Sequence, residues 1–362
     1  MPEPLRVLMV VGETAGGIGR HVASLAEHLP EHGVEVSICA PPSALAVIGA
    51  PAGVTRHETA IGPRRPLRTA GSRQRVRQLA RAAHVVHAHG LVAGAVAAGR
   101  GKKPLVTTWH NAARGSSARR AVHARLERYV ARASDLVLAV SPDLAARARA
   151  AGATAVHAVF VPAPIRPAVR LPDDVRDELG IGDRPFVLAV GRLTGQKRFD
   201  LLVEAAAAWR HRVDQPYIAI AGDGDARDAL SAQIRASGAA VTLLGGRSDV
   251  PDLLAAADVA VVTSEWEGCP LGVQETMRAG VPLVATAVGG IPDLVANAAT
   301  LVEFGDVAAL RGALERLLDD PSRRADAARR VRARAATWPT LEEVVVRHAE
   351  YYRNLAGREG AR

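Results

Sequence analysis

Residues 259–282 run Val-Ala-Val-Val-Thr-Ser-Glu-Trp-Glu-Gly-Cys-Pro-Leu-Gly-Val-Gln-Glu-Thr-Met-Arg-Ala-Gly-Val-Pro, and this segment indicates the fold of the chain. It opens with a compact apolar strand, Val259–Thr263, and continues through a loop into a short helix, 271–279, that stops at Gly-Val-Pro. Strand, loop and helix in this order form the repeating unit of a parallel α/β sheet. Ligands of open α/β sheets bind beyond the carboxyl ends of the strands. The loop between strand and helix is therefore a candidate site.

Two glutamates, Glu267 and Glu275, lie eight positions apart, one on this loop and one a turn into the helix. Both carboxylates can then face one crevice, where the hydroxyls of a polyhydroxylated ligand would donate to their oxygens. A purely structural interpretation also stands, because loop glutamates are usually solvated and Glu275 could cap or pair within its helix.

The spacing of the glutamates resembles the signature of retaining glycosyltransferases of family 4. The resemblance implies an α/β chain of two facing Rossmann-like doubly wound parallel-sheet domains, the GT-B fold, with an interdomain cleft. It implies that Glu267 holds sugar hydroxyls and is not a nucleophile, and that Glu275 binds the ribose diol of the donor. The intervening backbone is implied to contact the donor at Gly268, Cys269, Pro270 and Leu271, although Cys269–Pro270 departs from the family's pattern.

The rest of the chain alternates strands and helices in two halves, with a Pro-rich linker at 160–185 between them. We expect domains at 1–165, completed by a C-terminal helix from 340–362, and at 166–339. The family resemblance assigns acceptor binding to the first domain and nucleotide-sugar donor binding to the second. The predicted strands are Leu5–Val11, Val34–Cys39, His84–His89, Pro104–Trp109, Asp135–Val140, Phe186–Val190, Tyr217–Ala221, Val241–Leu244, Ala257–Thr263 and Val281–Thr286.

Composition bounds the class of protein. A chain of 362 residues can form two domains with cores of their own. It contains no run of 18 apolar residues, and the first strand begins at Leu5, which leaves no room for a signal peptide. The two cysteines, Cys39 and Cys269, lie in different halves, so a disulfide is not expected and a reducing cytoplasm fits.

The net charge of +9 comes with 43 arginines among 46 basic residues, which together with abundant alanine indicates a GC-rich, actinobacterial-like coding bias. Aromatic residues make up only 3% of the chain, too few for a nucleic-acid stacking surface. Arginines crowd two stretches of the first half, at 64–81 and 114–132. An anionic membrane surface, at the inner face of the plasma membrane, and a phosphorylated acceptor are candidate partners, and coding bias is the competing explanation.

The first strand is followed by a glycine-rich loop, Gly-Glu-Thr-Ala-Gly-Gly-Ile-Gly-Arg-His. Gly16 and Gly17 let the backbone approach a diphosphate at the start of a helix, although a tight turn explains them equally well. Val22 stands where the dinucleotide pattern needs its third glycine, which argues against a nicotinamide fingerprint. The loop resembles the family's N-terminal loop, and Arg20 is a candidate for the acceptor cleft.

The second half begins with Gly191-Arg-Leu-Thr-Gly-Gln-Lys197 directly after a strand. Arg192 and Lys197 can converge on one polyanion, Arg as a planar fork and Lys as a point charge. The structural alternative is a solvated basic loop. The block resembles the family's element whose Arg and Lys stabilise the departing nucleoside diphosphate.

Histidines mark two strand ends of the first half. His110 follows a strand, and the equivalent residue of the resembled family contacts the donor sugar. His84, His87 and His89 form a denser group, but they lack a carboxylate or Cys partner and alternate faces of the strand, so we expect no metal. Packing at the strand end is the favoured interpretation, with His89 near the acceptor cleft.

Further turns complete the resemblance. Ala-Gly222-Asp223-Gly and Leu-Gly-Gly-Arg247 are expected near the nucleoside, with Arg247 beside the base, and Val288-Gly-Gly-Ile-Pro-Asp293 follows the last strand.

The family resemblance therefore implies a retaining hexosyltransferase, and we expect it to need neither a metal nor a cofactor. It would move a hexosyl or N-acetylhexosaminyl group from a nucleoside-diphosphate sugar to a hydroxyl acceptor. Two alternatives remain: a two-domain nicotinamide-dependent oxidoreductase, and a non-catalytic nucleotide- or nucleic-acid-binding protein.

Overall fold

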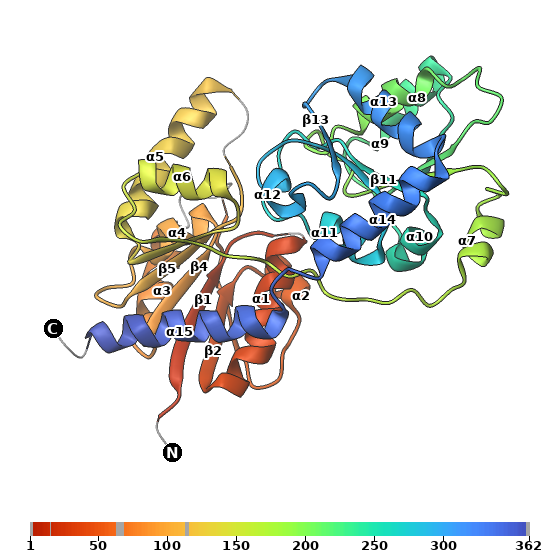
Figure 1. Cartoon of the computed structure of the whole chain (residues 1–362). Helices are drawn as coiled ribbons and strands as arrows, with labels where there is room; N and C mark the ends of the chain where they lie inside the picture. Colours follow the sequence, from red (N-terminus) through yellow and green to blue (C-terminus); the bar gives the residue numbers. More distant parts are fainter. Residues whose placement is uncertain (1–2, 15, 63–68, 113–115, 360–362) are drawn as a thin grey trace. The chain divides into compact units, whose positions relative to one another are not determined.

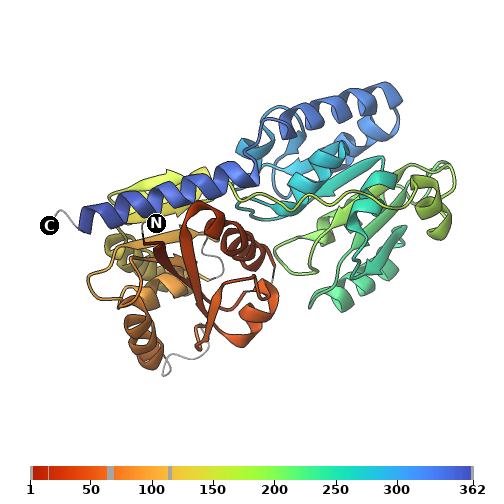
Figure 2. The same ribbon diagram turned by 90° about the horizontal axis from the view of Figure 1, so that it is seen from below.

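The structure is a computed structural model that describes residues 3–14, 16–62, 69–112 and 116–359 (Figure 1). The chain divides into two compact units. Unit 1 comprises Met1–Pro162 together with Pro339–Arg362, and unit 2 comprises Ala163–Trp338. Each unit is built around its own parallel sheet with helices on both faces (Figure 1 and Figure 2). These are the two Rossmann-like parallel-sheet domains that the sequence predicts.

The sheet of unit 1 has the strand order β3-β2-β1-β4-β5-β6-β7, and all described neighbours are parallel. Its central strands are buried along their whole length, as expected where helices cover both faces. The strands are β1 (Leu5–Val11), β2 (Val34–Ala40), β3 (Thr55–Glu58), β4 (Val85–His89), β5 (Leu105–Trp109), β6 (Leu136–Ala139) and β7 (Val156–Ala158).

The alternation of side chains along β4 separates two different layers of unit 1. Val86 and Ala88 face an apolar core formed with α3 and α4. His87 and His89 face the opposite side, where α1 and the C-terminal helix α15 pack (Figure 1). The helices of unit 1 are α1 (Gly17–His28), the 3-10 helix η1 (Leu29–His32), α2 (Pro42–Ile48), α3 (Thr69–Ala80), α4 (Leu91–Ala97), α5 (Ser117–Ala133), α6 (Pro142–Ala150) and α15 (Leu341–Glu359).

The sheet of unit 2 has the order β10-β9-β8-β11-β12-β13 and is also parallel throughout its described strands. The strands are β8 (Phe186–Val190), β9 (Tyr217–Ala221), β10 (Val241–Gly245), β11 (Val259–Val262), β12 (Leu283–Thr286) and β13 (Thr300–Val302). The helices are α7 (Pro172–Glu178), α8 (Phe199–Ala207), α9 (Arg227–Ser237), α10 (Val250–Ala256), α11 (Leu271–Ala279), α12 (Ile291–Val295), α13 (Val307–Leu318) and α14 (Pro321–Ala335).

All ten predicted strands are present, each within two residues of its predicted ends, and helix 271–279 is confirmed as α11. The sequence analysis missed β3, β7 and β13, which lie at sheet edges. Their sequences, Thr-Arg-His-Glu, Val-His-Ala and Thr-Leu-Val, are too short or too polar to show a strand pattern. Edge strands are buried on fewer sides, so their sequences carry less of the apolar signal.

Each sheet reverses its direction of strand addition once, between β1 and β4 in unit 1 and between β8 and β11 in unit 2. The loops that leave two such strands diverge to opposite faces and open a crevice at the carboxyl edge of the sheet. The switch point of unit 2 therefore lies between the loop after β8, with Arg192 and Lys197, and the loop after β11, with Glu267.

Glycines let the turn after β9 pack directly on the loop after β8. A Cβ at Gly222, where φ is 154°, would overlap the carbonyl oxygen of Gly191. Backbone hydrogen bonds join the same segments, from Gly191 N to Ala221 O (3.0 Å) and from Leu193 N to Asp223 O (2.9 Å). The Gly-Asp-Gly turn thereby supports the loop that carries Arg192 and Lys197.

We predict that Gly222→Ala lowers the free energy of unfolding of unit 2 by at least about 2 kcal/mol, through backbone strain and overlap with Gly191. The matched control is Gly246→Ala, because no atom lies within 4 Å of a Cβ there. Its effect should stay within about 0.5 kcal/mol. Thermal melting of both variants measures the difference, and equal melting temperatures would contradict this account of the turn.

Candidate functional site

An ion pair joins the two loops at the switch point of unit 2. Lys197 Nζ lies 2.6 Å from Glu267 Oε1, and Ser264 Oγ donates to the same oxygen at 2.7 Å. The side chain of Glu267 is 9% exposed and that of Lys197 25% exposed. A nearly buried carboxylate needs such partners, because removal of its hydration shell is otherwise strongly unfavourable. The structure thus brings together two of the residues that the sequence singled out.

Hydrogen bonds between the two loops fix this geometry. Thr263 Oγ1 donates to the carbonyl of Lys197 (2.8 Å), and Gln196 Nε2 donates to the carbonyl of Trp266 (2.7 Å). The amide of Glu265 also donates to the carbonyl of Gln196 (2.8 Å). The carbonyl of Lys197 and the residues just before Glu267 are therefore held by the opposite loop, so the approach of the two charges does not depend on the ion pair alone.

The Gly-Gly segment after β12 supports Glu267 from another side. The amide of Gly290 donates to the carbonyl of Glu267 at 2.9 Å. Gly289 has φ 54°, and a Cβ there would overlap the same carbonyl oxygen. This close approach explains the glycine at position 289. The segment therefore does two things: it supports the carbonyl of Glu267, and with Pro292 it starts helix α12.

Helix α11 begins directly after the Glu267 loop. Pro270 is its N-cap and Leu271 its first residue, and no side chain caps the described N-terminus. The first amides of the helix therefore point out of its end with their partial positive charge. Gly268 is buried, and Cys269 is partly exposed and accepts a hydrogen bond from Gln274 Nε2 (3.2 Å).

Glu275 lies in the second turn of α11, with 17% of its side chain exposed. Its Oε1 is 3.7 Å from Nη2 of Arg166, a half-exposed residue on the segment that leads into unit 2. Its neighbour Gln274 accepts the amide of Ala163 at 2.9 Å, and Arg278 donates to the carbonyl of Ala163 at 2.7 Å. One helix thus carries Glu275 and anchors the start of the unit. The sequence analysis missed the buried Gln274 and Ser264, since neither belongs to a motif with a recognisable spacing.

Three of the remaining predicted residues of unit 2 lie at exposed turns. Arg192 is exposed on the loop after β8. Gly222 is partly exposed and Asp223 exposed, and the Asp223 carboxylate accepts the amide of Gly224 at 2.9 Å. Asp223 therefore caps its own turn.

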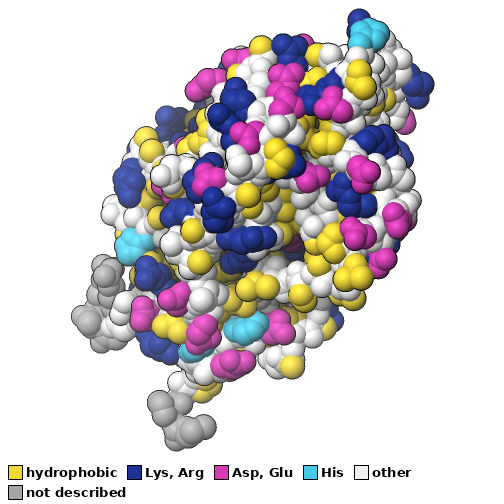
Figure 3. Space-filling model, turned by 45° about the vertical axis from the view of Figure 1, so that its right-hand side comes forward, with side chains coloured by type: hydrophobic (Ala, Val, Ile, Leu, Met, Phe, Trp, Pro, Cys, Tyr) yellow, Lys and Arg dark blue, Asp and Glu magenta, His cyan; other side chains and the backbone are white. Residues whose placement is uncertain are grey.

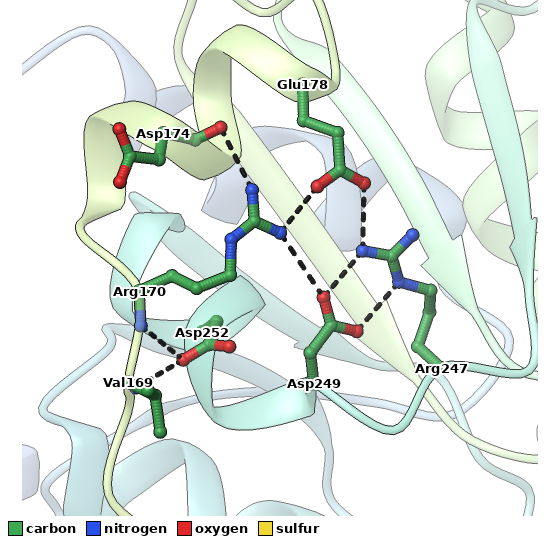
Figure 4. A network of polar contacts seen from close by, with 7 residues as sticks. All are labelled: Val169, Arg170, Asp174, Glu178, Arg247, Asp249 and Asp252. Atoms are coloured by element: carbon green, nitrogen blue, oxygen red, sulfur yellow. Dashed lines mark hydrogen bonds and ion pairs between the residues drawn. The ribbon is translucent and has the colours of Figure 1, made fainter.

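Arg247 belongs to a network of charges between α7 and α10 (Figure 4). Its guanidinium donates to Asp249 (2.6 and 2.8 Å) and to Glu178 (3.1 Å), and Arg170 donates to the second oxygen of Glu178. These acids raise the pKa of Arg247 above its usual value, mainly through the hydrogen bonds to Asp249. Because Asp252 also accepts the amides of Val169 and Arg170, the network fastens the linker to unit 2.

A pocket of about 230 Å³ lies at the switch point of unit 1. It is lined by the loops after β1, β4 and β5 and by residues of α1, α4 and α5. Polar lining residues are Glu13, Thr14, His89, His110, Asn111 and His123. His89 and His110 therefore lie together, with 3.3 Å between His89 Nδ1 and His110 Nε2.

These two histidines belong to a buried cluster of five, with His21 of α1, His87 of β4 and His348 of α15. Ring centroids of His87 and His89 are 4.1 Å apart, and those of His21 lie 5.7–5.8 Å from His89, His110 and His348. His87 is hydrogen-bonded to Tyr352 Oη and Thr108 Oγ1, each at 2.7 Å. The sequence analysis missed His21 and His348, and His348 lies too far along the chain for any local pattern to connect it with β4.

Burial keeps this cluster neutral. It lowers the pKa of His110 to about 3 and that of His348 to about 4. The pKa values of His21, His87 and His89 also lie well below the ordinary value, first through burial and then through repulsion from the other imidazoles. At neutral pH these rings therefore act as hydrogen-bonding groups without charge.

The glycine loop adjoins the pocket. Gly16, with φ 125° and ψ −121°, is the N-cap of α1, and Gly17 is its first residue, so the predicted glycines do form the turn that starts a helix. Arg20 is exposed on α1 and is not among the residues that line the pocket.

No group of three or more His, Cys, Asp or Glu residues in the described part of the chain has the arrangement of a metal site. Likewise, no described helix is both long and apolar enough to cross a bilayer.

Family models match both halves of the chain. Residues 15–169 match Glycosyltransferase Family 4, and residues 173–334 match Glycosyl transferases group 1. The chain belongs to glycosyltransferase family 4. Its GT-B fold is also that of sucrose-phosphate synthase from Thermosynechococcus elongatus, which is 23% identical with a TM-score of 0.82 over 98% of this chain and 100% of that one. Anabaena Alr3699/HepE in complex with UDP is 21% identical, with a TM-score of 0.79 over 97% and 100% of the two chains.

Curated glycosyltransferases match the chain over a shorter region. The alpha-D-kanosaminyltransferase of Streptomyces kanamyceticus is 35% identical over 157 residues, 42% of this chain and 41% of that protein. The GDP-mannose-dependent phosphatidylinositol monomannoside mannosyltransferase of Mycolicibacterium smegmatis is 33% identical over 164 residues, 42% and 43% of the two chains. The matched regions thus span about two fifths of these relatives.

The neutral histidine cluster generates a prediction about pH. An unfolded histidine binds a proton below pH 6.5, whereas the buried rings bind theirs only at much lower pH, near pH 4 for His348 and pH 3 for His110. Each such histidine lowers the stability of unit 1 by about 1.4 kcal/mol per pH unit as the pH falls from 6.5 toward 4. Above pH 6.5 these histidines are neutral in both the folded and the unfolded state, so this loss of stability is absent.

Hydrogen exchange of β4 and β5 amides should therefore accelerate over this range once corrected for intrinsic rates. Unit 2 supplies an internal control, because its single histidine, His211, is exposed. His348→Leu should reduce the pH slope of unit 1 by about one proton, while His211→Asn should not. Parallel pH responses of the two units would contradict this account.

Proposed function

We propose that the chain is a retaining hexosyltransferase that moves a hexosyl or N-acetylhexosaminyl group from a nucleoside-diphosphate sugar to a hydroxyl acceptor. The observation that carries the proposal is the Lys197–Glu267 pair at 2.6 Å, at the switch point of unit 2 and directly before the N-terminus of α11. This arrangement offers a cation and helix amides for a diphosphate, and carboxylate oxygens for sugar hydroxyls.

Each part of the donor has a matching group under this proposal. Arg192, Lys197 and the amides at Leu271 would hold the diphosphate. Glu267 would accept hydrogen bonds from the sugar ring, and Glu275 would accept those of the ribose diol. Anabaena Alr3699/HepE was solved with UDP, which supports a nucleotide donor for this chain as well.

The proposed chemistry is electrostatic. Negative charge builds on the diphosphate as the glycosidic bond breaks, and cations that are already in place stabilise it without reorganisation. Glu267 would not attack the anomeric carbon, because under this proposal its carboxylate faces the hydroxyls of the sugar ring, while Lys197 and Ser264 hold its Oε1. The acceptor would attack from the face that the diphosphate leaves, and the departing phosphate would take its proton. His110, kept neutral by burial, would donate a hydrogen bond to a sugar hydroxyl without adding charge.

Unit 1 would supply the acceptor side, through the pocket that contains His89. Its 230 Å³ accommodates a group the size of one sugar ring. Glu13, Asn111 and the imidazoles offer both acceptors and donors to hydroxyl groups. The acceptor sugar could be borne by a lipid or by a phosphorylated metabolite, and a lipid-linked acceptor would bring the enzyme to the inner face of the plasma membrane. No metal or organic cofactor enters the proposal.

We predict that Lys197→Met lowers turnover of the nucleotide sugar by roughly 10²-fold or more, the scale of losing one transition-state stabiliser. Lys102→Met, an exposed lysine of unit 1, is the control and should keep full turnover. A steady-state assay of sugar transfer measures both.

The double variant Lys197→Met/Glu267→Gln separates two roles of the lysine. If Lys197 only neutralised the buried Glu267, the double variant would turn over as fast as Glu267→Gln alone, because the lysine would have no carboxylate left to neutralise. The proposal requires the double variant to regain thermal stability and to turn over far more slowly than Glu267→Gln. Equal turnover of these two variants would remove Lys197 from the diphosphate site.

A further prediction separates the two glutamates. Glu275→Ala should weaken binding of the bare nucleoside diphosphate and the full donor alike, by about 1–3 kcal/mol, because the ribose hydroxyls lose their acceptor. Glu267→Ala should bind the bare diphosphate at least as tightly as the unchanged protein, since Lys197 loses a competing carboxylate, while turnover of the full donor falls.

Calorimetry with the bare nucleoside diphosphate and with the full nucleotide sugar measures these affinities in both variants. Glu265→Ala, on the exposed part of the same loop, is the control and should change neither affinity. Equal losses of bare-diphosphate affinity in the Glu267 and Glu275 variants would contradict the assignment of separate partners.

A further inference from the structure

A strained backbone residue directly follows the lysine of the candidate site. In the described part of the chain, only two residues other than glycine have a positive φ, Arg198 (48°) and Ala296 (50°). Ala296 ends helix α12, and helix ends often take a positive φ. Arg198 instead precedes helix α8 as its N-cap, with ψ 42° in the left-handed region, where an ordinary N-cap is extended. A residue with a Cβ is unfavourable in that region, so other contacts must hold Arg198 there.

The side chain of Arg198 is held by two neighbours. Its guanidinium forms a fork with Asp200 in the first turn of α8, with Nε at 3.0 and 3.1 Å from the two carboxylate oxygens and Nη2 at 2.9 Å from one of them. The same guanidinium lies over the ring of Phe304, 5.2 Å from its centroid. Phe304 follows β13, so these contacts anchor Arg198 both to its own helix and to a distant segment of unit 2.

An ion pair alone does not distinguish Arg198 from other arginines. On the face of the molecule shown in Figure 3, basic and acidic side chains are intermingled. Arg212 also forms a fork with the acid two residues ahead, Asp214, with both N···O distances at 3.0 Å. Arg212 nevertheless has no positive φ. What sets Arg198 apart is that its fork accompanies a left-handed backbone next to Lys197.

The backbone of Arg198 decides the direction in which Lys197 leaves helix α8. The start of this helix is fixed, because Phe199 and Leu202 are buried in the core of unit 2. The φ and ψ angles of Arg198 lie between this fixed helix and the lysine, so a return to an extended backbone would turn Lys197 in another direction. The carbonyl of Lys197 also accepts a hydrogen bond from Thr263 Oγ1 at 2.8 Å, which ties the same peptide to the opposite loop.

We propose that Arg198 is a positioning residue that aims Lys197 at the diphosphate of the donor. This inference rests on the proposed function, which assigns Lys197 to that diphosphate. The contacts with Asp200 and Phe304 maintain the left-handed turn, and the turn holds Lys197 Nζ where it meets Glu267 at 2.6 Å. A lysine side chain is flexible, so a fixed backbone removes part of the freedom that a transition-state cation must lose.

Lysine labelling tests this role without donor or acceptor. The chain contains three lysines, Lys102, Lys103 and Lys197, so competitive acetylation with acetic anhydride, read by mass spectrometry, reports each of them separately. In Arg198→Gly the fork is lost and the backbone is free to leave the left-handed region. The reactivity of Lys197 relative to Lys102 should then rise by about threefold or more, the scale of weakening a partly exposed ion pair.

Two further variants make the labelling result specific. Arg212→Gly removes the matched fork to Asp214 and should leave the reactivity of Lys197 unchanged. Asp200→Asn keeps Arg198 but weakens its fork, and should raise the reactivity of Lys197 in the same direction as Arg198→Gly. Circular dichroism checks the fold of each variant, and Asp200→Asn decides the question if Arg198→Gly does not fold.

Sugar transfer tests whether Arg198 acts through Lys197. Arg198→Gly should lower kcat by about tenfold or more, the scale of a misplaced catalytic group, and should lower kcat more than it raises KM. In the Lys197→Met background the same substitution should cause no further loss, because no lysine remains to be aimed. Arg212→Gly should keep full turnover.

Unchanged reactivity of Lys197 in both the Arg198 and the Asp200 variants would overturn the proposal. So would an equal loss of turnover from Arg198→Gly with and without Lys197, since Arg198 would then act by another route. If the unchanged protein transfers no sugar, the proposed function fails, whereas a rise in Lys197 reactivity would still support the positioning of Lys197 by Arg198.

Discussion

The right-handed crossover of parallel strands is the constraint on which this structure depends. A chain that adds strands in one direction with right-handed connections places every helix on the same face of the sheet. To cover both faces it must return once to the middle and add strands in the other direction. That reversal falls between β1 and β4 in unit 1 and between β8 and β11 in unit 2. Both candidate sites lie at these reversals, because only there do two neighbouring loops diverge and leave room for a ligand.

Charge burial shapes the site of unit 2. Glu267 has lost most of its contact with water, and Lys197 and Ser264 replace that hydration. The pairing also restrains the lysine, whose flexible side chain would otherwise sample many positions. A donor diphosphate would compete with the carboxylate for this cation. The ion pair thus keeps both groups in place and leaves each able to exchange its partner.

Unit 1 also buries titratable side chains, but keeps them uncharged. Five imidazoles pack between β4, β5, α1 and α15, and none of them has a carboxylate partner among the hydrogen bonds and ion pairs described for them. Burial with other imidazoles as neighbours makes protonation unfavourable, which keeps the rings neutral. The cluster attaches α15 to β4 through the bond between His87 and Tyr352, at a separation of 265 residues. It also fixes His89 and His110 at the pocket wall.

Much of this protein follows from local sequence. The apolar strands, the helix stop at Gly280 and the loops that carry Arg192, Lys197 and Glu267 depend on residues close together in the chain, where period and turn chemistry act directly. The family motifs are local for the same reason. Edge strands such as β3 and β13 escaped prediction because half-exposed strands need little apolar sequence.

Tertiary structure decided what depends on distant partners. Strand order places the loop after β8 against the loop after β11, and no local pattern encodes that adjacency. The same holds for the Lys197–Glu267 bond across 70 residues, for His348 beside His21, and for Arg247, whose guanidinium is held by Glu178 and Asp249. The sequence specifies which chemical groups lie in the loop after each strand. The winding of the sheet specifies which of them meet, because contacts between distant segments arise only when the whole sheet is assembled.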